Sequence, residues 1–430
     1  MKTNVHATDG EHLRRSCCAL DWLAFVLADV QTGVGPFLVT YLAAARHWQP
    51  FDIGVAMSVG SIAGMIAQTP AGWLIDRLRR KRELIAVGSA LVALGSFGVM
   101  YFQSFCMIVA VEALLGVVGS LFPPSMAGMS LGIVGHSRLD RRIGRNETFN
   151  HAGNVVTAAL AGGLGYALAQ EAIFYVVIAF SLIAIVLVFR IRAADIDFER
   201  ARGGVSEKDG AAVAGVAELF RDRRITIFII SVVLFHFANA AMLPLIGQRL
   251  SEGHPRESPL YMSICIVGAQ MVMSLVAAPS GILAKRWGRK AVFTVGLCVL
   301  PVRGILYTVT VKPAFLITVQ LLDGVAAAIF GVVSVLVVAD LTRGTGRFNL
   351  TQGAVATATA AGGALSTFAA ESIVQHWGYN PAFLTLAVIA LGNLVFFRVA
   401  MPETLRELPM ADRGLCSANP EMKYAKSKIG

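Results

Sequence analysis

The chain has 430 residues, of which 56% are hydrophobic and 15% charged, and its mean hydropathy is +0.65. Soluble domains carry about a quarter charged residues, so this composition is typical of a membrane protein. The net charge of +10 does not indicate nucleic-acid binding, because the basic residues form no stripe interleaved with aromatics. The six cysteines form no CxxC pair and no zinc spacing with histidine, so neither a metal site nor a cofactor is predicted.

The N-terminal segment, residues 1–16, is polar and lacks the apolar core and cleavage site of a signal peptide. Twelve apolar runs follow, each close to the roughly 20 residues that cross a bilayer as a helix. The runs lie near residues 17–43, 51–75, 83–102, 105–134, 147–169, 171–190, 225–248, 259–284, 291–309, 313–340, 349–372 and 381–400. The sequence therefore predicts an all-α membrane protein with twelve transmembrane helices.

A polar stretch rich in charge and glycine separates the sixth run from the seventh. The expected organisation is an N-terminal tail at 1–16, a six-helix bundle at 17–190, a central loop at 191–224, a second six-helix bundle at 225–400 and a C-terminal tail at 401–430. Both tails and the central loop are expected to be cytoplasmic.

That orientation follows from the distribution of lysine and arginine. With the N-terminus inside, the cytoplasmic loops hold basic clusters at 77–82, 138–145, 285–290 and 343–347. The opposite side holds only Arg46, Arg249, Arg256 and Lys312. Cytoplasmic loops carry the excess of basic residues in membrane proteins. We therefore expect a multi-pass integral protein with both termini cytoplasmic, in the inner (plasma) membrane of a bacterium.

Short segments recur in the two halves at a nearly constant offset. Residues 111–116 (VEALLG) resemble 319–324 (VQLLDG), residues 35–38 resemble 243–246, and residues 72–81 (GWLIDRLRRK) resemble 281–290 (GILAKRWGRK). The offsets are 208, 208 and 209, which indicates duplicated halves. Parallel repeats of this kind place a binding site near the midplane, between the halves.

The twelve spans, the repeat and the loop after the second span together resemble the major facilitator superfamily. In that family the loop reads roughly G-x-L-A-D-R-x-G-R-K. The first copy here matches at Gly72, Leu74, Asp76, Arg77, Arg80 and Lys81, with Arg79 in place of the second glycine. The second copy matches at Gly281, Leu283, Ala284, Arg286, Gly288, Arg289 and Lys290, with Lys285 in place of the acid. The resemblance implies that family's fold.

The resemblance also implies that this loop is a gate. Asp76 would then meet the N-terminal end of a helix in the other half, where a carboxylate is stabilised, and so close the cytoplasmic side. The predicted gating residues are Gly72, Asp76, Arg77, Arg80, Lys81, Gly281, Arg286, Gly288 and Arg289. The alternative is that the basic residues, particularly Arg80, Lys81 and Arg82, only anchor the topology.

Several spans carry polar and small residues along one helical face. The resemblance places spans one, four, seven and ten around a central cavity, and charges at membrane depth are costly and usually functional. The predicted substrate- or proton-binding residues are Asp29, Glu112, His151, Asn154, His236, Asn239, Gln320 and Asp323. For each of them the alternative is a buried structural pair or a helix-packing contact. The resemblance places span nine at the periphery, so Arg303 in that span is expected to form a structural pair or to snorkel, and less to bind an anion.

These features predict a secondary active transporter that moves a small organic solute by alternating access, coupled to protons. Burial raises the pKa of a carboxylate and a nearby cation lowers it, so a cavity acid can take up and release a proton. The acidic cavity favours cationic or polar neutral substrates. Efflux is favoured over the alternatives, import of a metabolite or siderophore and uncoupled facilitation. No enzyme activity and no nucleic-acid partner are expected; the partners are the substrate, protons and the lipid bilayer, and the chain is expected to be a monomer.

Overall fold

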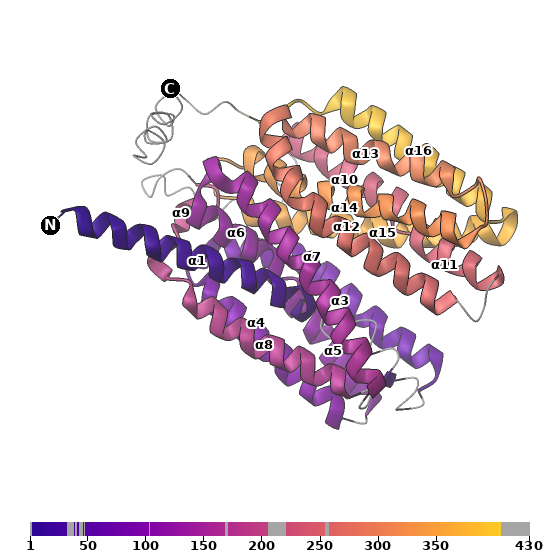
Figure 1. Ribbon diagram of the computed structural model, residues 1–430, viewed down its shortest axis with the longest axis horizontal. Coiled ribbons are helices and arrows are strands. Elements are labelled where there is room, and N and C mark those ends of the chain that lie inside the picture. The colour runs from indigo at the N-terminus through magenta and orange to yellow at the C-terminus, as the bar shows by residue number, and fades with distance from the viewer. Residues whose placement is uncertain are drawn as a thin grey trace, which may run out of the picture.

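The structure, a computed structural model, describes residues 2–31, 38, 41–42, 46, 48–102, 104–167, 171–204, 221–253 and 258–405. These residues form helices and loops without a strand, as predicted. The first bundle contains α1 (Lys2–Val30), α3 (Pro50–Arg77), α4 (Lys81–Tyr101), α5 (Phe105–Gly119), α6 (Phe122–Val134), α7 (His136–Ala167) and α8 (Ala172–Arg190). The second contains α10 (Arg223–Asn239), α11 (Met242–Gly253), α12 (Ser258–Trp287), α13 (Arg289–Leu306), α14 (Pro313–Leu341), α15 (Phe348–Trp377) and α16 (Tyr379–Ala400) (Figure 1).

Two predicted spans are each interrupted. The run at 105–134 is divided into α5 and α6, and the run at 225–248 into α10 and α11. Proline cannot donate a backbone hydrogen bond within a helix, and Pro123 and Pro124 follow the first break closely, as Pro244 follows the second. Counting each interrupted pair as one helix, the described residues provide six helices in each bundle. The predicted twelve-helix fold is therefore confirmed, with two broken members.

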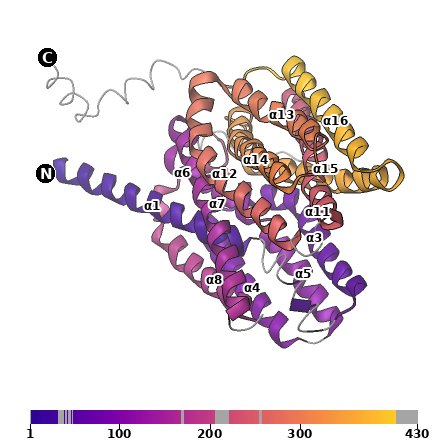
Figure 2. The same cartoon turned by 45° about the vertical axis from the view of Figure 1, so that its right-hand side comes forward.

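Eight helical stretches of the described chain are long and apolar enough to cross a membrane. Helices α1, α7, α13 and α15 are not among these eight. Helix α7 starts with a run of charged residues and α15 is rich in threonine, glycine and alanine. Both helices lie where the bundles meet, with α7 against α12 and α15 against α3 (Figure 2). Their polar composition therefore reflects a position inside the assembly.

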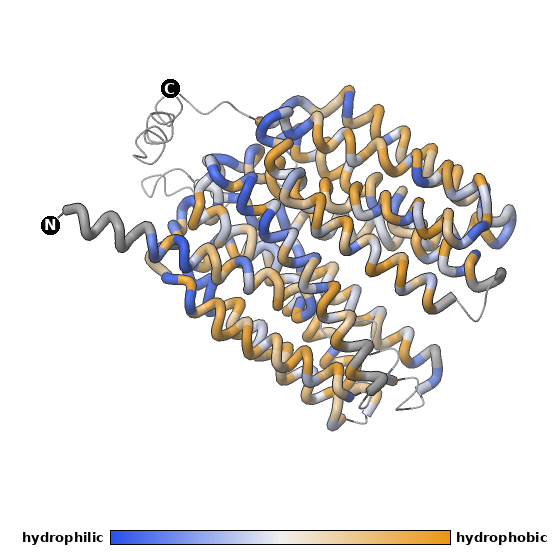
Figure 3. The backbone as a smooth tube through the Cα atoms, viewed as in Figure 1, coloured by the Kyte–Doolittle hydropathy of each residue, from blue (hydrophilic) through white to orange (hydrophobic). Residues whose placement is uncertain are grey.

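Charged loops gather at one end of the molecule, here named the basic end (Figure 3). It contains the α3–α4 turn, the α6–α7 turn, the α12–α13 turn and the start of α15. Arginines cluster around the α3–α4 turn at residues 77–82 and in the first turns of α7 at residues 138–145. The short helices η1 (Ala193–Asp195) and α9 (Phe198–Ala201) of the connecting segment also lie at this end.

Glycines let the bundles approach closely near the basic end. A Cβ atom on Gly72 would overlap the backbone of Asn349, and one on Gly281 would overlap the backbone of Asp140. Gly72 and Gly281 are 209 positions apart (281 minus 72), and their partners Asp140 and Asn349 are also 209 positions apart (349 minus 140). The repeat found in the sequence is thus a structural one, because α3 packs on α15 as α12 packs on α7.

We predict that Gly72→Ala destabilises the protein by about 1–3 kcal/mol, because overpacking against a backbone carbonyl cannot be relieved by a rotamer change. Gly54→Ala in the same helix is the matched control, since a Cβ atom there meets nothing within 4 Å. Alanine in an open helical position stabilises by about 0.5–1 kcal/mol relative to glycine, so the two changes should shift the Tm in opposite directions. Equal Tm values for the two variants would contradict the proposed close contact.

Candidate functional site

A cavity of about 730 Å³ lies between the bundles. Its walls come from α1, α3, α5, α6 and α7 of the first bundle and from α14 and α15 of the second. The polar lining residues are Gln31, Ser61, Gln68, Glu112, Ser120, Asn146, Glu147, Asn150, Gln352 and Thr359. Among the described lining residues there are two carboxylates and neither lysine nor arginine. The cavity is therefore acidic.

Glu112 reaches the cavity because α5 and α3 are in close contact. A Cβ atom on Gly60 would lie 3.1 Å from the carbonyl oxygen of Glu112, and one on Gly64 would lie 3.1 Å from that of Gly116. Gly60 and Gly64 form a G-x-x-x-G pair, a spacing that allows helix backbones to pack tightly in membranes. The small residues of span four thus serve helix packing and cavity lining together.

Glu147 is a cavity carboxylate that the sequence analysis missed. It lies on α7, and its Oε2 atom is 3.7 Å from Nε2 of His151, one turn further along. His151 Nδ1 is 2.8 Å from Oε1 of Gln270 on α12, in the other bundle. The i, i+4 spacing of glutamate and histidine is the available signal in the sequence, but Glu147 follows Arg141, Arg142 and Arg145 and stands at the predicted start of the fifth span. His151 bridges the bundles beside the cavity.

Asp323 and Gln320 belong to a separate polar cluster inside the second bundle. Asp323 forms an ion pair with Arg303, whose side chain is fully buried. Arg303 Nη1 also donates to Asn239 Oδ1 at 2.8 Å, and Gln320 Nε2 donates to Asp323 Oδ2 at 3.2 Å. Tyr307 donates its hydroxyl hydrogen to Gln320. A buried guanidinium thus gathers Asn239, Gln320 and Asp323 between α10, α13 and α14, and none of the three is in the described lining of the cavity.

The remaining predicted residues lie around the cavity without appearing in its described lining. Asp29 is buried in the last turn of α1. The ring centroid of His236 lies 4.7 Å from that of Phe330, a residue of the cavity lining. Asn154 is half-buried on α7, about one turn beyond Asn150. The small and polar residues of span one that follow Asp29, residues 32–37, lie outside the described part of the chain.

At the basic end, Asp76 binds the N-terminus of α15. Its carboxylate is fully buried and accepts hydrogen bonds from the backbone N–H of Asn349 at 3.1 Å, from that of Leu350 at 2.8 Å and from Asn349 Nδ2 at 2.7 Å. A carboxylate at a helix N-terminus satisfies otherwise unpaired donors and meets the positive end of the helix dipole. Asp76 therefore contacts a helix of the other bundle.

The basic residues of this loop serve different contacts. Lys81 is buried and donates to the carbonyl of Leu78 at 3.2 Å, which shapes the α3–α4 turn. The guanidinium of Arg77 stacks on Trp73, 3.8 Å from the ring centroid. Arg80 is exposed at the start of α4. Among the described residues, the inter-bundle contacts of the first copy's predicted gating residues are those of Asp76 and Gly72.

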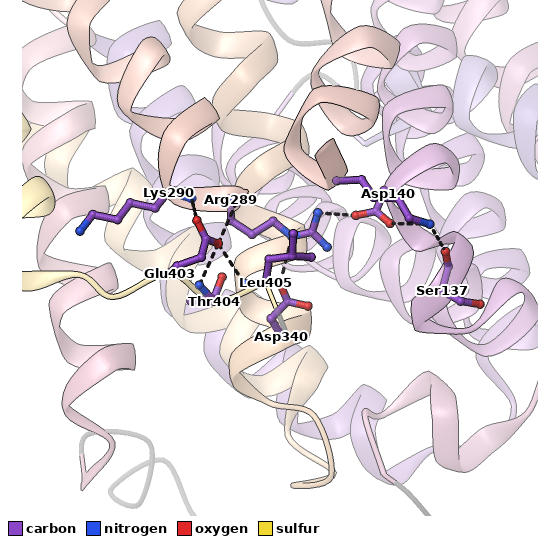
Figure 4. A network of polar contacts seen from close by, with 9 residues as sticks. Ser137, Asp140, Arg289, Lys290, Asp340, Glu403, Thr404 and Leu405 are labelled. Atoms are coloured by element: carbon purple, nitrogen blue, oxygen red, sulfur yellow. Dashed lines mark hydrogen bonds and ion pairs between the residues drawn. The ribbon is translucent and has the colours of Figure 1, made fainter. Parts of the chain in front are cut away.

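The second copy of the loop makes the corresponding contact with the first bundle, at the start of α7, and carries a lysine where the first copy carries an aspartate (Figure 4). Asp140 at the start of α7 forms an ion pair with Arg289, which also bonds Asp340 at 3.0 Å. Lys285 stands at the position equivalent to Asp76, 209 residues later, and donates to the carbonyl of Ser137 at 2.7 Å. Arg286 is exposed. Asp140 was not among the predicted residues, because nothing in the sequence shows which loop faces the second copy.

Gly288 lets the chain turn into α13. Its φ of 96° lies in the region that favours glycine, and the following N–H groups of Arg289 and Lys290 bond the carboxylate of Glu403 at 2.9 and 3.1 Å. This turn holds Arg289 in place for Asp140. The two inter-bundle contacts, Asp76 with α15 and Asp140 with Arg289, are named the basic-end latch below.

Two six-helix bundles around a shared cavity are the architecture of a membrane transporter. The model of the Major Facilitator Superfamily matches residues 21–278 and 257–415. An uncharacterized MFS-type transporter from each of two Mycobacterium tuberculosis strains is 43% identical over 389 residues, which cover 90% of this chain and 93% of the relative. The chain belongs to the Major Facilitator Superfamily.

Solved structures agree on the fold. The chain is similar to the transporter FucP in the outward conformation, with a TM-score of 0.69 and 15% identity over 90% of this chain and 98% of that one. It is also similar to the proton:xylose symporter XylE bound to 6-bromo-6-deoxy-D-glucose, with a TM-score of 0.70 and 11% identity over 92% of this chain and 97% of that one. At such identities the likeness establishes the fold alone.

Proposed function

We propose that this protein is a proton-coupled secondary transporter of a small organic solute. The observation that carries the proposal is an acidic cavity between the two bundles, together with the basic-end latch, in which the bundles contact each other through Asp76 and through Asp140. A carrier needs a site that is reached from alternate sides, and a latch at one end with a cavity behind it meets that need. Glu112 and Glu147 are the groups we assign to proton binding within the cavity.

The lining suggests the class of substrate. Two carboxylates, with neither lysine nor arginine among the described lining residues, favour a cation or a polar neutral compound over an anion. Met57, Met65 and Met126 add flexible, polarizable apolar walls, which adapt to ligands of different shape. We propose a small organic cation as the preferred substrate class, with a polar neutral solute as the second candidate.

Direction and orientation are also proposals. The arginine-rich basic end is assigned to the cytoplasm of a bacterial cell, with the central loop and both chain ends on that side. The latch is closed here, which corresponds to a cavity open to the outside. XylE, similar in fold, is named as a proton symporter, which supports proton coupling. We favour efflux, and keep import of a metabolite and uncoupled facilitation as the alternatives.

Proteoliposomes containing the purified chain and a trapped pH dye test the proposal. Compounds from cationic, neutral and anionic classes are added one at a time. If the protein is proton-coupled, addition of a transported cation should change the internal pH. An imposed pH gradient should in turn drive movement of the same cation across the membrane. Transport of a compound without any proton movement would establish the facilitator instead. No pH change and no uptake across all classes would refute the transport proposal.

The latch makes a separate prediction. Asp76→Asn removes the charge that binds three donors of α15, and bonds to a charged acceptor contribute about 1.5–3 kcal/mol each. Loss of about 2 kcal/mol of this stabilisation should raise the population of the state with an open basic end roughly 30-fold. The reporter is Thr357→Cys in a cysteine-free background, because Thr357 meets Thr69 across the bundles at 2.8 Å.

The measurement is the labelling rate of that cysteine by an impermeant maleimide applied to the basic end. Asp52→Asn at the other end of α3 is the matched control, and its labelling should equal that of the unmodified background. An unchanged rate in a well-expressed Asp76→Asn variant would show that Asp76 is only a topological anchor.

A further inference from the structure

A second cavity, of about 880 Å³, lies at the basic end between α1, α7 and α12. We name it the basic cleft. Seven arginine and lysine side chains line it, against two carboxylates. The transport proposal assigns no role to this excess of positive charge. The cleft is formed by both bundles, since α1 and α7 belong to the first and α12 to the second.

The two carboxylates of the basic cleft are already paired. Asp21 binds Arg142 and accepts from Arg145 Nε at 2.8 Å, while Asp140 binds Arg289 and lies 3.9 Å from Lys285. The four other basic side chains of the cleft are exposed and have no carboxylate partner among the described residues; they are Arg14, Arg138, Arg141 and Arg286. Like charges that surround one cavity repel one another, so a bound anion would stabilise this arrangement.

Apolar side chains lie on the same helix faces as two of these arginines. On α1, Arg14, Cys18 and Trp22 follow one another at intervals of four residues and share a face. On α12, Arg286 and Ile282 are also four residues apart. Trp22 packs edge-on against Phe25 and Phe149 and still is 50% exposed, and Ile282 is 48% exposed. Tryptophan is enriched where a membrane meets water, so this level matches the boundary of a leaflet.

We propose that the basic cleft binds an anionic phospholipid. The phosphodiester headgroup would bind Arg138, Arg141 and Arg286, since arginine recognises phosphate through several parallel hydrogen bonds. The acyl chains would lie along the faces of Trp22 and Ile282. Basic pockets between transmembrane helices suit such headgroups, and a free phosphate ion would leave the apolar faces uncovered.

The proposed lipid would also stabilise the latch. Arg138 and Arg141 flank Asp140 in the first bundle, while Arg286 lies three residues before Arg289 in the second. A headgroup that contacts both sides would hold the two bundles together at the basic end. An anionic lipid would therefore favour the conformation observed here, because it binds that state more tightly than one in which the bundles separate.

The test is native mass spectrometry of the full chain in detergent, titrated with dioleoylphosphatidylglycerol or dioleoylphosphatidylcholine. We expect preferential binding of phosphatidylglycerol. The triple variant Arg138→Gln, Arg141→Gln, Arg286→Gln should lose about 100-fold in affinity, because each basic residue near the surface contributes about 1 kcal/mol. The matched control replaces three exposed arginines of the same end outside the cleft, Arg190, Arg192 and Arg398, with glutamine and should retain the affinity.

A second pair of variants tests the acyl chains. Ile282→Ser should weaken binding of phosphatidylglycerol, whereas Ile266→Ser, at a 45% exposed position of α12 far from the cleft, should not. Competition by inorganic phosphate separates the two sources of the anion. If millimolar phosphate displaces the lipid completely and Ile282→Ser has no effect, the cleft is a site for a free anion and the lipid proposal is wrong. Equal losses in the two triple variants would refute a site at the cleft.

Discussion

Replacing Glu147 with glutamine is expected to abolish proton-driven accumulation of substrate while exchange of substrate across the membrane continues. Glutamine keeps the shape of the side chain but cannot bind and release a proton. A gradient of one pH unit contributes about 1.36 kcal/mol per proton, which drives roughly tenfold accumulation, and the variant should lose that factor entirely. The measurement compares gradient-driven uptake with counterflow in proteoliposomes. Full accumulation by the variant would exclude Glu147 as the coupling group.

Glu112→Gln is the parallel variant, and Asp29→Asn tests the third acid near the path. Glu171→Gln, at the start of α8 outside the described lining of the cavity, is the matched control and should accumulate substrate normally. If only Asp29→Asn loses accumulation, the proton site lies in α1 rather than in the cavity. This comparison is informative because all four changes replace a carboxylate with the amide of the same length.

The contact of Asp76 was predictable from the resemblance to the family. The loop motif gave the residue, and the resemblance implied that its partner is the N-terminal end of a helix in the other half. The structure adds the identity of the partner, Asn349 and Leu350, and the reversed charge of the second contact through Lys285. The sequence did not reveal Asp140, because a carboxylate between arginines in a loop is equally consistent with a solvated surface.

The pairing of Asp323 with Arg303 could not be predicted from the sequence, for a different reason. Helical periodicity shows which residues share a face, but not which neighbouring helix covers that face. Gln320 and Asp323 do share a face, and α13 covers it with Arg303. Glu147 was missed for the opposite reason, since it follows Arg141, Arg142 and Arg145 in the sequence while its neighbours in space form the cavity.

Asp323→Asn should destabilise the protein by about 3–5 kcal/mol, because breaking a buried ion pair leaves an uncompensated charge. Arg303 is fully buried, so its guanidinium cannot reach water when the aspartate loses its charge. The expected result is a clearly lower Tm of the purified variant in detergent. Arg303→Met should be destabilising as well, since it leaves the carboxylate of Asp323 without its cation.

The double variant Arg303→Met, Asp323→Leu distinguishes a structural pair from a transport residue. Replacing both partners of a buried pair with apolar side chains of similar volume is often neutral or stabilising, so the Tm should return to that of the unmodified protein or exceed it. If the pair only stabilises the second bundle, the double variant should also transport. A double variant with a normal Tm and no transport would instead assign Asp323 to the proton or substrate path, at a site distinct from Glu112 and Glu147. Single variants with an unchanged Tm would show that the pair does not stabilise the fold.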